Sequence, residues 1–184
     1  NINPNDKEII LNFANYLIEI GDYTYAIANL DNYLQIDKDD PAIYFLKGRI
    51  YIKMENLKLA EKSIILAAAK SDKNPKYLNS LGYVNSKLGN IDKAIAAYTM
   101  TLKKDSKNSY ALYNLGVIHF NLNENEKAVS FFYKSGLSYL KEKRYDKVGK
   151  TINDLNELVN LGINANQELN DLTNKLQDVV KENV

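Results

Sequence analysis

Apolar residues recur along this chain at intervals of three or four positions, and the spacing persists through most of the sequence. Such a spacing is typical of the buried face of an α-helix, whereas a half-buried strand alternates at every second position. Short clusters of turn residues, such as Gly21-Asp22 and Gly89-Asn90, interrupt the apolar stretches. The chain has only eight Gly and three Pro, too few for a turn-rich β protein. We therefore predict an all-α fold.

Small residues reveal a period of 34 positions. Gly48, Gly82 and Gly116 follow one another at that interval, and Ala14 stands 34 positions before the first of them. A second series keeps the same interval and consists of Ala26, Ala60, Ala94 and Ala128. Two series in phase indicate an internal repeat. Because each period holds two helical stretches with a turn between them, the repeating unit is a helix–turn–helix.

The positions of small and capping residues predict where each helix pair begins. Antiparallel helices approach closely only where one presents a small side chain to the other. Asp40, Asn74 and Asn108 precede helical stretches and are predicted N-caps. Pro41 and Pro75 suit the first turn of a helix, where a backbone N–H is unpaired in any case. We expect helix pairs to begin near residues 6, 41, 75 and 109, with turns near 21, 55, 89 and 123.

This unit resembles the tetratricopeptide repeat (TPR), a 34-residue helix–turn–helix with a large residue, a Leu-Gly pair, an aromatic residue and an Ala at fixed positions. The large first position is occupied by Ile10, Tyr44, Leu78 and Leu112. Lys47, Asn85 and His119 depart from the family pattern and indicate locally looser packing. The resemblance covers about residues 6–142. It implies a right-handed α-solenoid of stacked helix pairs.

The period divides the chain into four TPR-like repeats and a C-terminal remainder. The repeats are expected at about 7–40, 41–74, 75–108 and 109–142. Residues 143–184 no longer follow the period and are predicted to form C-terminal capping helices, or else a degenerate fifth repeat. One of these helices carries Val148 and Leu155 on its apolar face, and the next carries Leu169 and Leu172. A repeat stack needs an atypical terminal element to cover its open apolar end.

The sequence offers little catalytic chemistry. It contains no Cys and a single His, His119, which occupies a packing position of the repeat. A lone His without Cys or a second His does not make the usual zinc site, and no glycine-rich phosphate loop is present. We therefore predict a protein that is not an enzyme and has no cofactor and no metal. The net charge of +1 without a basic run argues against nucleic acid as a partner.

The longest strongly apolar run, Ile64–Ala69, is far too short to cross a bilayer, so no direct membrane insertion is expected. The chain begins Asn-Ile-Asn-Pro without Met, and any targeting segment is expected upstream of residue 1. We expect a soluble protein of the cytoplasm or the periplasm, and the sequence does not decide between them.

The first helices of a helical-pair solenoid line a concave groove in which extended ligands lie. The groove is predicted to be amide-rich near its N-terminal end, basic in the middle and aromatic near its C-terminal end. Its predicted partner-binding residues are Asn12, Asn15, Phe45, Arg49, Lys53, Lys76, Asn79, Tyr83, Lys87, Tyr110, Tyr113, Asn114, Val117 and Phe120. This pattern favours a peptide or helix of another protein that is acidic and carries an apolar anchor.

Some TPR proteins hold a terminal carboxylate with a five-residue clamp of Lys, Asn, Asn, Lys and Arg. The corresponding positions over the first three repeats are Leu11, Asn15, Leu46, Lys76 and Ser80, so two of the five match. This argues against a chaperone C-terminal tail as the ligand.

The leading functional prediction is a non-catalytic protein–protein interaction scaffold that binds its partner in the concave groove. Two alternatives stay open at this point. The chain is a regulatory or docking domain of a larger enzyme or multiprotein assembly, or it is a self-association module that uses the solenoid ends or the last helix.

Overall fold

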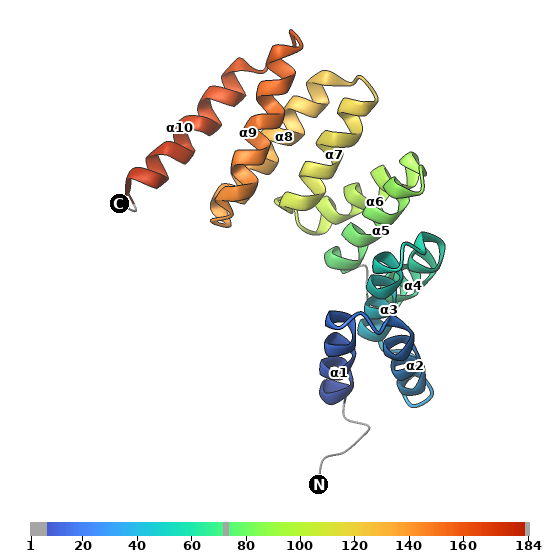
Figure 1. Cartoon of the computed structure of the whole chain (residues 1–184). Coiled ribbons are helices and arrows are strands. Elements are labelled where there is room, and N and C mark those ends of the chain that lie inside the picture. The colour runs from blue at the N-terminus through green and yellow to red at the C-terminus, as the bar shows by residue number, and fades with distance from the viewer. Residues whose placement is uncertain (1–6, 72–73, 183–184) are drawn as a thin grey trace. The chain divides into compact units, whose positions relative to one another are not determined.

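The computed structural model describes residues 7–71 and 74–182, and within them it contains ten α-helices and no strand (Figure 1). Helix follows helix with only short turns between them. The helices are α1 (Lys7–Glu19), α2 (Tyr23–Leu34), α3 (Pro41–Lys53), α4 (Leu57–Ala69), α5 (Pro75–Lys87), α6 (Ile91–Lys104), α7 (Ser109–Asn121), α8 (Asn125–Lys141), α9 (Tyr145–Asn160) and α10 (Asn166–Glu182). The predicted all-α fold of helix–turn–helix units is confirmed.

The helices form two compact units, residues 1–94 and residues 95–184, and α6 spans the boundary. In the first unit, each of the helices α1 to α4 packs against the next one along the chain. In the second unit α7 packs on α8, α8 on α9 and α9 on α10, and α10 also contacts α8. Each unit is therefore built from helices that are neighbours in sequence.

The turns inside the helix pairs repeat with the predicted period. Gly21, Glu55, Gly89 and Asn123 are spaced 34 residues apart, and all four have positive φ angles, of 82, 58, 77 and 58°. This left-handed conformation ends one helix and reverses the chain within a few residues. Glycine adopts it without a steric penalty, whereas Glu55 and Asn123 hold it at some energetic cost.

The predicted N-caps are also confirmed. The side chains of Asp40, Asn74 and Asn108 accept hydrogen bonds from backbone N–H groups two or three positions later, at 2.9, 2.9 and 3.1 Å. Pro41 and Pro75 begin α3 and α5. These residues fix where the first helix of a pair starts, and with it the direction in which each side chain of that helix points.

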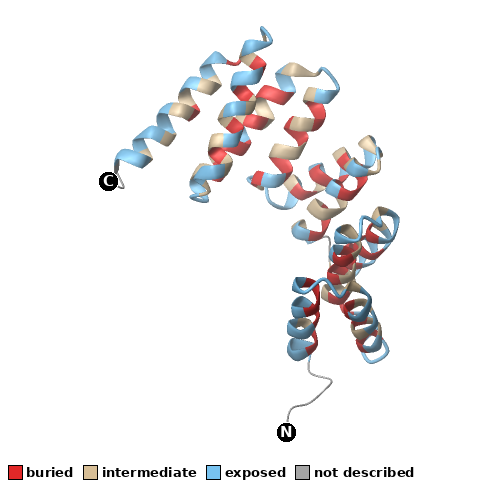
Figure 2. Ribbon diagram, in the orientation of Figure 1, coloured by how far each residue is buried: buried red, intermediate tan, exposed pale blue. Residues whose placement is uncertain are grey.

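The two series of small residues lie where helices cross. Ala26, Ala60, Ala94 and Ala128 are fully buried, and Gly48, Gly82 and Gly116 are buried too (Figure 2). A Cβ atom added to Gly48 would lie 2.5 Å from Cγ1 of Ile64, and one added to Gly116 would lie 2.7 Å from Cδ1 of Phe132. Both distances are shorter than any van der Waals contact, so glycine is required for the two helices of each pair to approach this closely.

The C-terminal helices share one core with the last helix pair. Val148, Leu155 and Leu158 of α9 and Leu172 of α10 are buried in a cluster that includes Phe132 of α8. Gly136 of α8 admits α10, since a Cβ atom there would lie 2.3 Å from Cδ2 of Leu172. Whether these helices are a cap or a degenerate fifth repeat stays open.

A hydrogen bond between α8 and α10 adds a polar contact to this core. The hydroxyl of Tyr133 donates to Oδ2 of Asp171 at 2.6 Å, and Lys175 pairs with the other oxygen of the same carboxylate. The hydrogen bond from the neutral phenol to Asp171, together with burial, raises the pKa of Tyr133 from 10.0 to about 12. If Tyr133 were ionised, its negative charge would lie next to the negative charge of Asp171, which is unfavourable.

Adding one methyl group should have opposite effects at two glycines of the second unit. Gly116→Ala should lower the free energy of unfolding by about 1–3 kcal/mol, because the new methyl overlaps the ring of Phe132. Gly149→Ala is the matched control: nothing lies within 4 Å of its added Cβ atom, so better helix propensity should raise stability by about 1 kcal/mol. Urea denaturation measures both. Equal stabilisation by the two substitutions would contradict the close approach of α7 and α8.

Alkaline pH should weaken the attachment of α10. The pKa of Tyr133 is higher in the folded chain than its ordinary value, so the stability it contributes is fully present below pH 10. That contribution is lost as the pH rises from 10 to about 12. Tyr133→Phe should therefore be less stable than the parent chain at neutral pH, and the difference should shrink across this window. Thermal unfolding at a series of pH values tests it, and a difference that does not vary with pH would contradict the assignment.

Candidate functional site

Helices α3 and α5, the first helices of the second and third pairs, carry five cationic side chains and no carboxylate. Lys47 forms an ion pair with Asp31 of α2. The other four cations are exposed, and all four belong to the predicted groove: Arg49, Lys53, Lys76 and Lys87. Two neighbouring first helices therefore present positive charge without internal compensation.

The beginnings of α3 and α5 lie side by side. The ring of Phe45 lies 4.5 Å, centroid to centroid, from that of Tyr77, and the ammonium of Lys76 lies 5.3 Å above the Phe45 ring. Phe45 is only 6% exposed. Among the predicted groove residues it therefore serves as packing between the helices and as a support for Lys76, rather than as an open contact surface.

Further along α5, three predicted residues follow one another at intervals of one helical turn. Tyr83 is 41% exposed, and the ammonium of Lys87 lies 5.8 Å from its ring centroid. Asn79 stands one turn before Tyr83, and its side-chain oxygen is buried without a hydrogen-bond partner among the described residues. The row thus offers an amide, an aromatic ring and a cation.

We call the six residues of α3 and α5 that remain available the basic face: Arg49, Lys53, Lys76, Asn79, Tyr83 and Lys87. Arg49 and Lys53 have no ion-pair partner within residues 7–71 and 74–182. On α1, Asn15 occupies the position equivalent to Arg49 and Tyr83, and Asn15 and its predicted neighbour Asn12 are both exposed. All these residues belong to the first compact unit.

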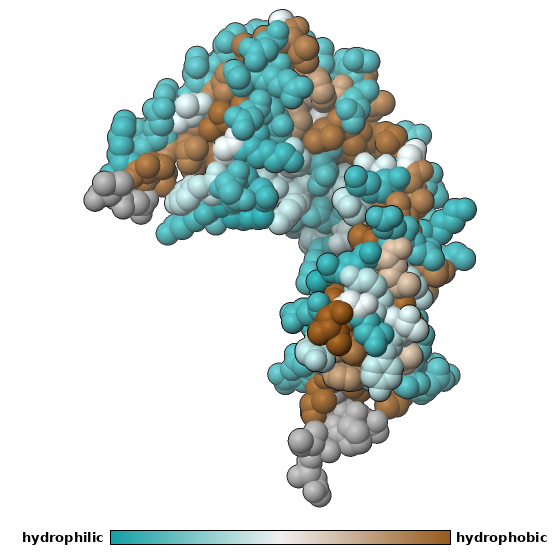
Figure 3. All heavy atoms as spheres, in the orientation of Figure 1, coloured by the Kyte–Doolittle hydropathy of each residue, from teal (hydrophilic) through white to brown (hydrophobic). Residues whose placement is uncertain are grey.

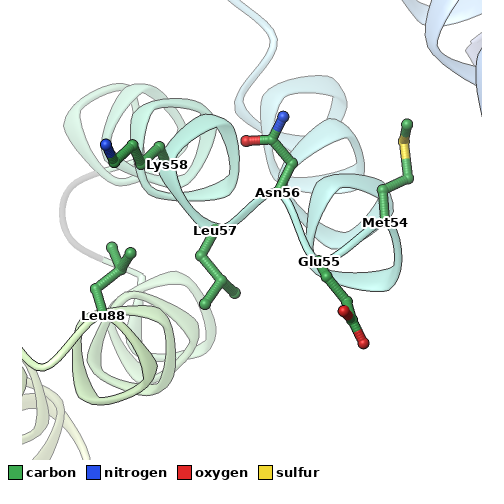
Figure 4. Close-up of a pocket in the computed structure, with 6 residues that line it drawn as sticks. All are labelled: Met54, Glu55, Asn56, Leu57, Lys58 and Leu88. Atoms are coloured by element: carbon green, nitrogen blue, oxygen red, sulfur yellow. The ribbon is translucent and has the colours of Figure 1, made fainter.

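A shallow depression lies at the end of this unit, between the α3–α4 turn and the end of α5. It is lined by Met54, Glu55, Asn56, Leu57, Lys58 and Leu88. Figure 4 shows these side chains spread around it rather than converging on one point, with the ends of Glu55 and Lys58 directed apart. The charged ends of Glu55 and Lys58 are therefore not brought together in this depression.

In the second unit, Tyr113 is engaged by its neighbours. Its hydroxyl donates to Oδ2 of Asp154 at 2.8 Å, its ring lies 5.6 Å from that of Phe132, and the ammonium of Lys150 lies 4.8 Å from its ring centroid. Burial, followed by the hydrogen bond to Asp154, raises the pKa of Tyr113 well above its ordinary value. Tyr113 therefore joins α7 to α9 in this fold, and a role for it in partner binding stays a prediction.

The other groove residues predicted on α7 also make contacts within the fold. Val117 and Phe120 are half-buried against the core of α8, α9 and α10, and Asn114 donates to the carbonyl oxygen of Tyr110 at 2.8 Å. Tyr110 is 46% exposed, with the guanidinium of Arg144 4.6 Å from its ring centroid. Tyr110 is thus the most open of these aromatic residues.

Three residues that engage these tyrosines were not among the predicted site residues: Arg144, Lys150 and Asp154. They follow α8, which has 17 residues where α4 has 13, so the 34-residue period no longer locates them. The available signal was the amphipathic helix after residue 144. If this helix is treated as the first helix of a fifth pair, it is predicted to place a polar side chain opposite Tyr113.

His119 occupies the packing position expected from the sequence. Its ring is buried and stacks on Phe131 at 5.2 Å, and Nδ1 contacts the carboxylate of Glu124. Among the described residues no three His, Asp or Glu side chains gather in a group that could hold a metal ion. None of the described helices combines the length and the apolar character needed to cross a membrane.

Two sequence profiles of the Tetratricopeptide repeat family match the chain, one over residues 17–81 and the other over residues 80–138. The chain belongs to the tetratricopeptide repeat family. The matched residues extend from α1 into α8, while α9 and α10 lie beyond them. No curated protein sequence matches this TPR chain.

Solved structures of TPR proteins share the fold. A crystal structure of MamA is 23% identical, with a TM-score of 0.69 over 77% of this chain and 83% of that one. YrrB, described as a TPR protein with an unusual peptide-binding site, is 19% identical, with a TM-score of 0.61 over 97% and 94%. The first TPR of Spaghetti (RPAP3), bound to the HSP90 peptide SRMEEVD, is 20% identical, with a TM-score of 0.61 over 66% and 97%. At these identities the likeness establishes the fold alone.

Removing the hydroxyl of Tyr113 should destabilise the fold. Tyr113→Phe leaves the carboxylate of Asp154 without its hydrogen bond and should lower the free energy of unfolding by about 0.5–1.5 kcal/mol. Tyr145→Phe is the control, since Tyr145 is exposed and the described residues give its hydroxyl no hydrogen bond. Denaturant unfolding compares the two, and equal stability of both variants would contradict a structural role for the Tyr113 hydroxyl.

Proposed function

We propose that this TPR chain is a non-catalytic interaction module whose basic face binds an acidic peptide segment of another protein. The observation that carries the proposal is the concentration of uncompensated positive charge on α3 and α5, two adjacent first helices without a single Asp or Glu. TPR neighbours that bind peptides support the general role.

The chemistry of the face favours a carboxylate-bearing ligand. Exposed Arg49 and Lys53 on α3 stand beside a helix that carries Lys76 and Lys87. Cations at the rim of an interface accelerate association and set its salt dependence more than they set its affinity. An acidic segment lying along α3 and α5 would compensate these charges.

Affinity requires a contact that excludes water, and Tyr83 is the residue of the basic face best suited to make it. Its ring is partly exposed, and Lys87 already covers one side of it. Tyrosine is enriched among residues that dominate binding energies. The unpaired side-chain oxygen of Asn79, one turn away, could accept a hydrogen bond from the backbone of a bound peptide.

The proposed ligand is an internal acidic segment rather than a chaperone tail. The peptide SRMEEVD in the RPAP3 structure is likewise acidic. In this chain, however, Leu11, Leu46 and Ser80 occupy three of the five positions that hold a terminal carboxylate in that mode of binding. We therefore do not propose recognition of a free C-terminus.

Reversing two charges on the basic face should weaken binding to an acidic probe. The probe is a fluorescent synthetic peptide with Glu residues flanking a Leu-Trp pair, and its counterpart has Lys in place of every Glu. Lys53→Glu with Lys87→Glu should reduce affinity for the acidic peptide about tenfold at low ionic strength, and less at high salt. Fluorescence anisotropy at several salt concentrations measures this.

The matched control is Lys58→Glu with Lys62→Glu on α4, which changes the net charge equally in the same unit. It should leave binding of the acidic peptide close to that of the parent chain. Equal weakening by both pairs would mean that net charge rather than the basic face attracts the peptide. Equal affinity of the parent chain for the acidic and the Lys-containing peptide would overturn the proposal.

Truncating Tyr83 should produce a different signature. Tyr83→Ala should weaken binding of the acidic peptide by about tenfold or more at every salt concentration, since a desolvated contact is not screened by ions. Its partly exposed side chain allows the change with little effect on folding, which circular dichroism checks. A loss that disappears at high salt would show that Tyr83 is not the anchor.

A further inference from the structure

Helix α1 presents a continuous apolar stripe on its outer side. Ile9, Phe13, Tyr16 and Ile20 follow one another at intervals of four, three and four residues, which places them on one face of a helix. They are 40, 38, 54 and 58% exposed. The backbone N–H of Ile20 bonds to the carbonyl of Tyr16, so the helical course continues as far as Ile20. Hydrophobic side chains reach the surface over the N-terminal helices in Figure 3.

Two of the four positions, those of Ile9 and Tyr16, are buried in the second and third repeats. The residues 34 positions after Ile9 and Tyr16 are Ile43 and Ile50, which are fully buried in one core with residues of α1 and α2. In the following repeat Tyr77 and Val84 occupy these positions, and both are buried. Two positions of the stripe on α1 therefore have the register of an interface between helix pairs. Among the described residues, Tyr25 of α2 packs edge-on against the ring of Phe13 at 5.9 Å, and all four stripe residues still keep more than a third of their surface exposed.

The C-terminal end of the chain does not offer a complementary surface. The outward side chains of α10 are mainly polar, among them Asn170, Asn174, Gln177 and Lys181. Two copies joined head to tail would place these groups against Phe13 and Tyr16 and leave them without partners. A partner with the matching chemistry is instead the stripe itself.

The stripe is self-complementary in sequence. Read from either end, it is Ile, aromatic, aromatic, Ile, with the same intervals. Two copies packed antiparallel would bring Ile9 against Ile20 of the other copy, and Phe13 against Tyr16. Phe13 and Tyr16 already stack at 6.5 Å within one chain, which presents a preformed aromatic centre.

We propose that two copies of this chain associate through the outer face of α1, antiparallel about a twofold axis that passes between Phe13 and Tyr16. One helix face from each copy buries less surface than the roughly 1,200 Å² that stable complexes use. The dimer should therefore be weak, with a dissociation constant of about micromolar or higher. The contact is separate from the basic face on α3 and α5.

Sedimentation equilibrium over a concentration series from about 10 µM to about 1 mM tests the association. The average mass should rise from one chain toward two and stop there, and Tyr16→Glu should keep the chain monomeric throughout. Ile36→Glu is the control: Ile36 is 59% exposed in the same unit but lies outside the stripe, and this variant should dimerise like the parent. A monomer at all concentrations, growth beyond two chains, or unchanged dimerisation of Tyr16→Glu would each overturn the proposal.

Disulfide formation tests the register, and the absence of Cys from the chain gives a clean background. The double variant Ile9→Cys with Ile20→Cys should form a linked dimer on oxidation. Within one helix these positions are about 16 Å apart, which is too far for a disulfide inside one chain. Either single substitution should fail to link, because in this register Ile9 of one copy lies about 16 Å from Ile9 of the other, and the same holds for Ile20. Linkage of a single variant as efficient as that of the double one would contradict the antiparallel register.

Peptide binding by the basic face and dimerisation through α1 can be tested independently of each other. Tyr16→Glu should bind the acidic peptide probe as the parent chain does, because the stripe and the basic face share no residue. Loss of peptide binding in this variant would show that α1 belongs to the peptide site, and would overturn the assignment of its outer face to a second copy.

Discussion

The close approach of antiparallel helices is the constraint on which the rest of this structure depends. At Gly48 and Gly116 even a single methyl group would overlap the facing side chain. Such tight packing forces one helix of each pair into a fixed rotation against the other. That rotation decides which residues of the first helix point to the core, which point to the next pair and which point to solvent.

One set of equivalent positions illustrates how this rotation assigns roles. Leu11, Phe45, Asn79 and Tyr113 are spaced 34 residues apart, and the sequence alone predicts that the last three face a groove. Phe45 packs between α3 and α5, and Tyr113 is bonded to α9, whereas Asn79 has an unsatisfied side-chain oxygen. The position therefore serves packing where the residue is aromatic, and at Asn79 it leaves a side-chain oxygen without a partner among the described residues.

The difference between local and tertiary contacts explains which features could be predicted from the sequence. Helix starts, caps and turns depend on local backbone chemistry, so Asp40, Asn74 and the left-handed residue at each turn could be located from the period. The basic residues could be located as well, since a Lys or Arg beside an apolar stripe seldom points inward. The partners of Tyr113 could not, because they depend on the added length of α8 and on where that length places α9.

The two ends of the repeat series are finished in different ways, and the difference has a physical consequence. At the C-terminal end, α10 turns Leu172 inward, and its outward side chains are mainly polar, with Val180 as an exposed apolar residue. At the N-terminal end, α1 exposes apolar side chains at two positions that the second and third repeats bury, and it exposes two aromatic rings that are in contact with each other. Covering exposed aromatic surface lowers its free energy, and the mainly polar outer side of α10 gains less from being covered. Association should therefore proceed through the first helix pair, and it leaves the cations of α3 and α5 available for a different partner.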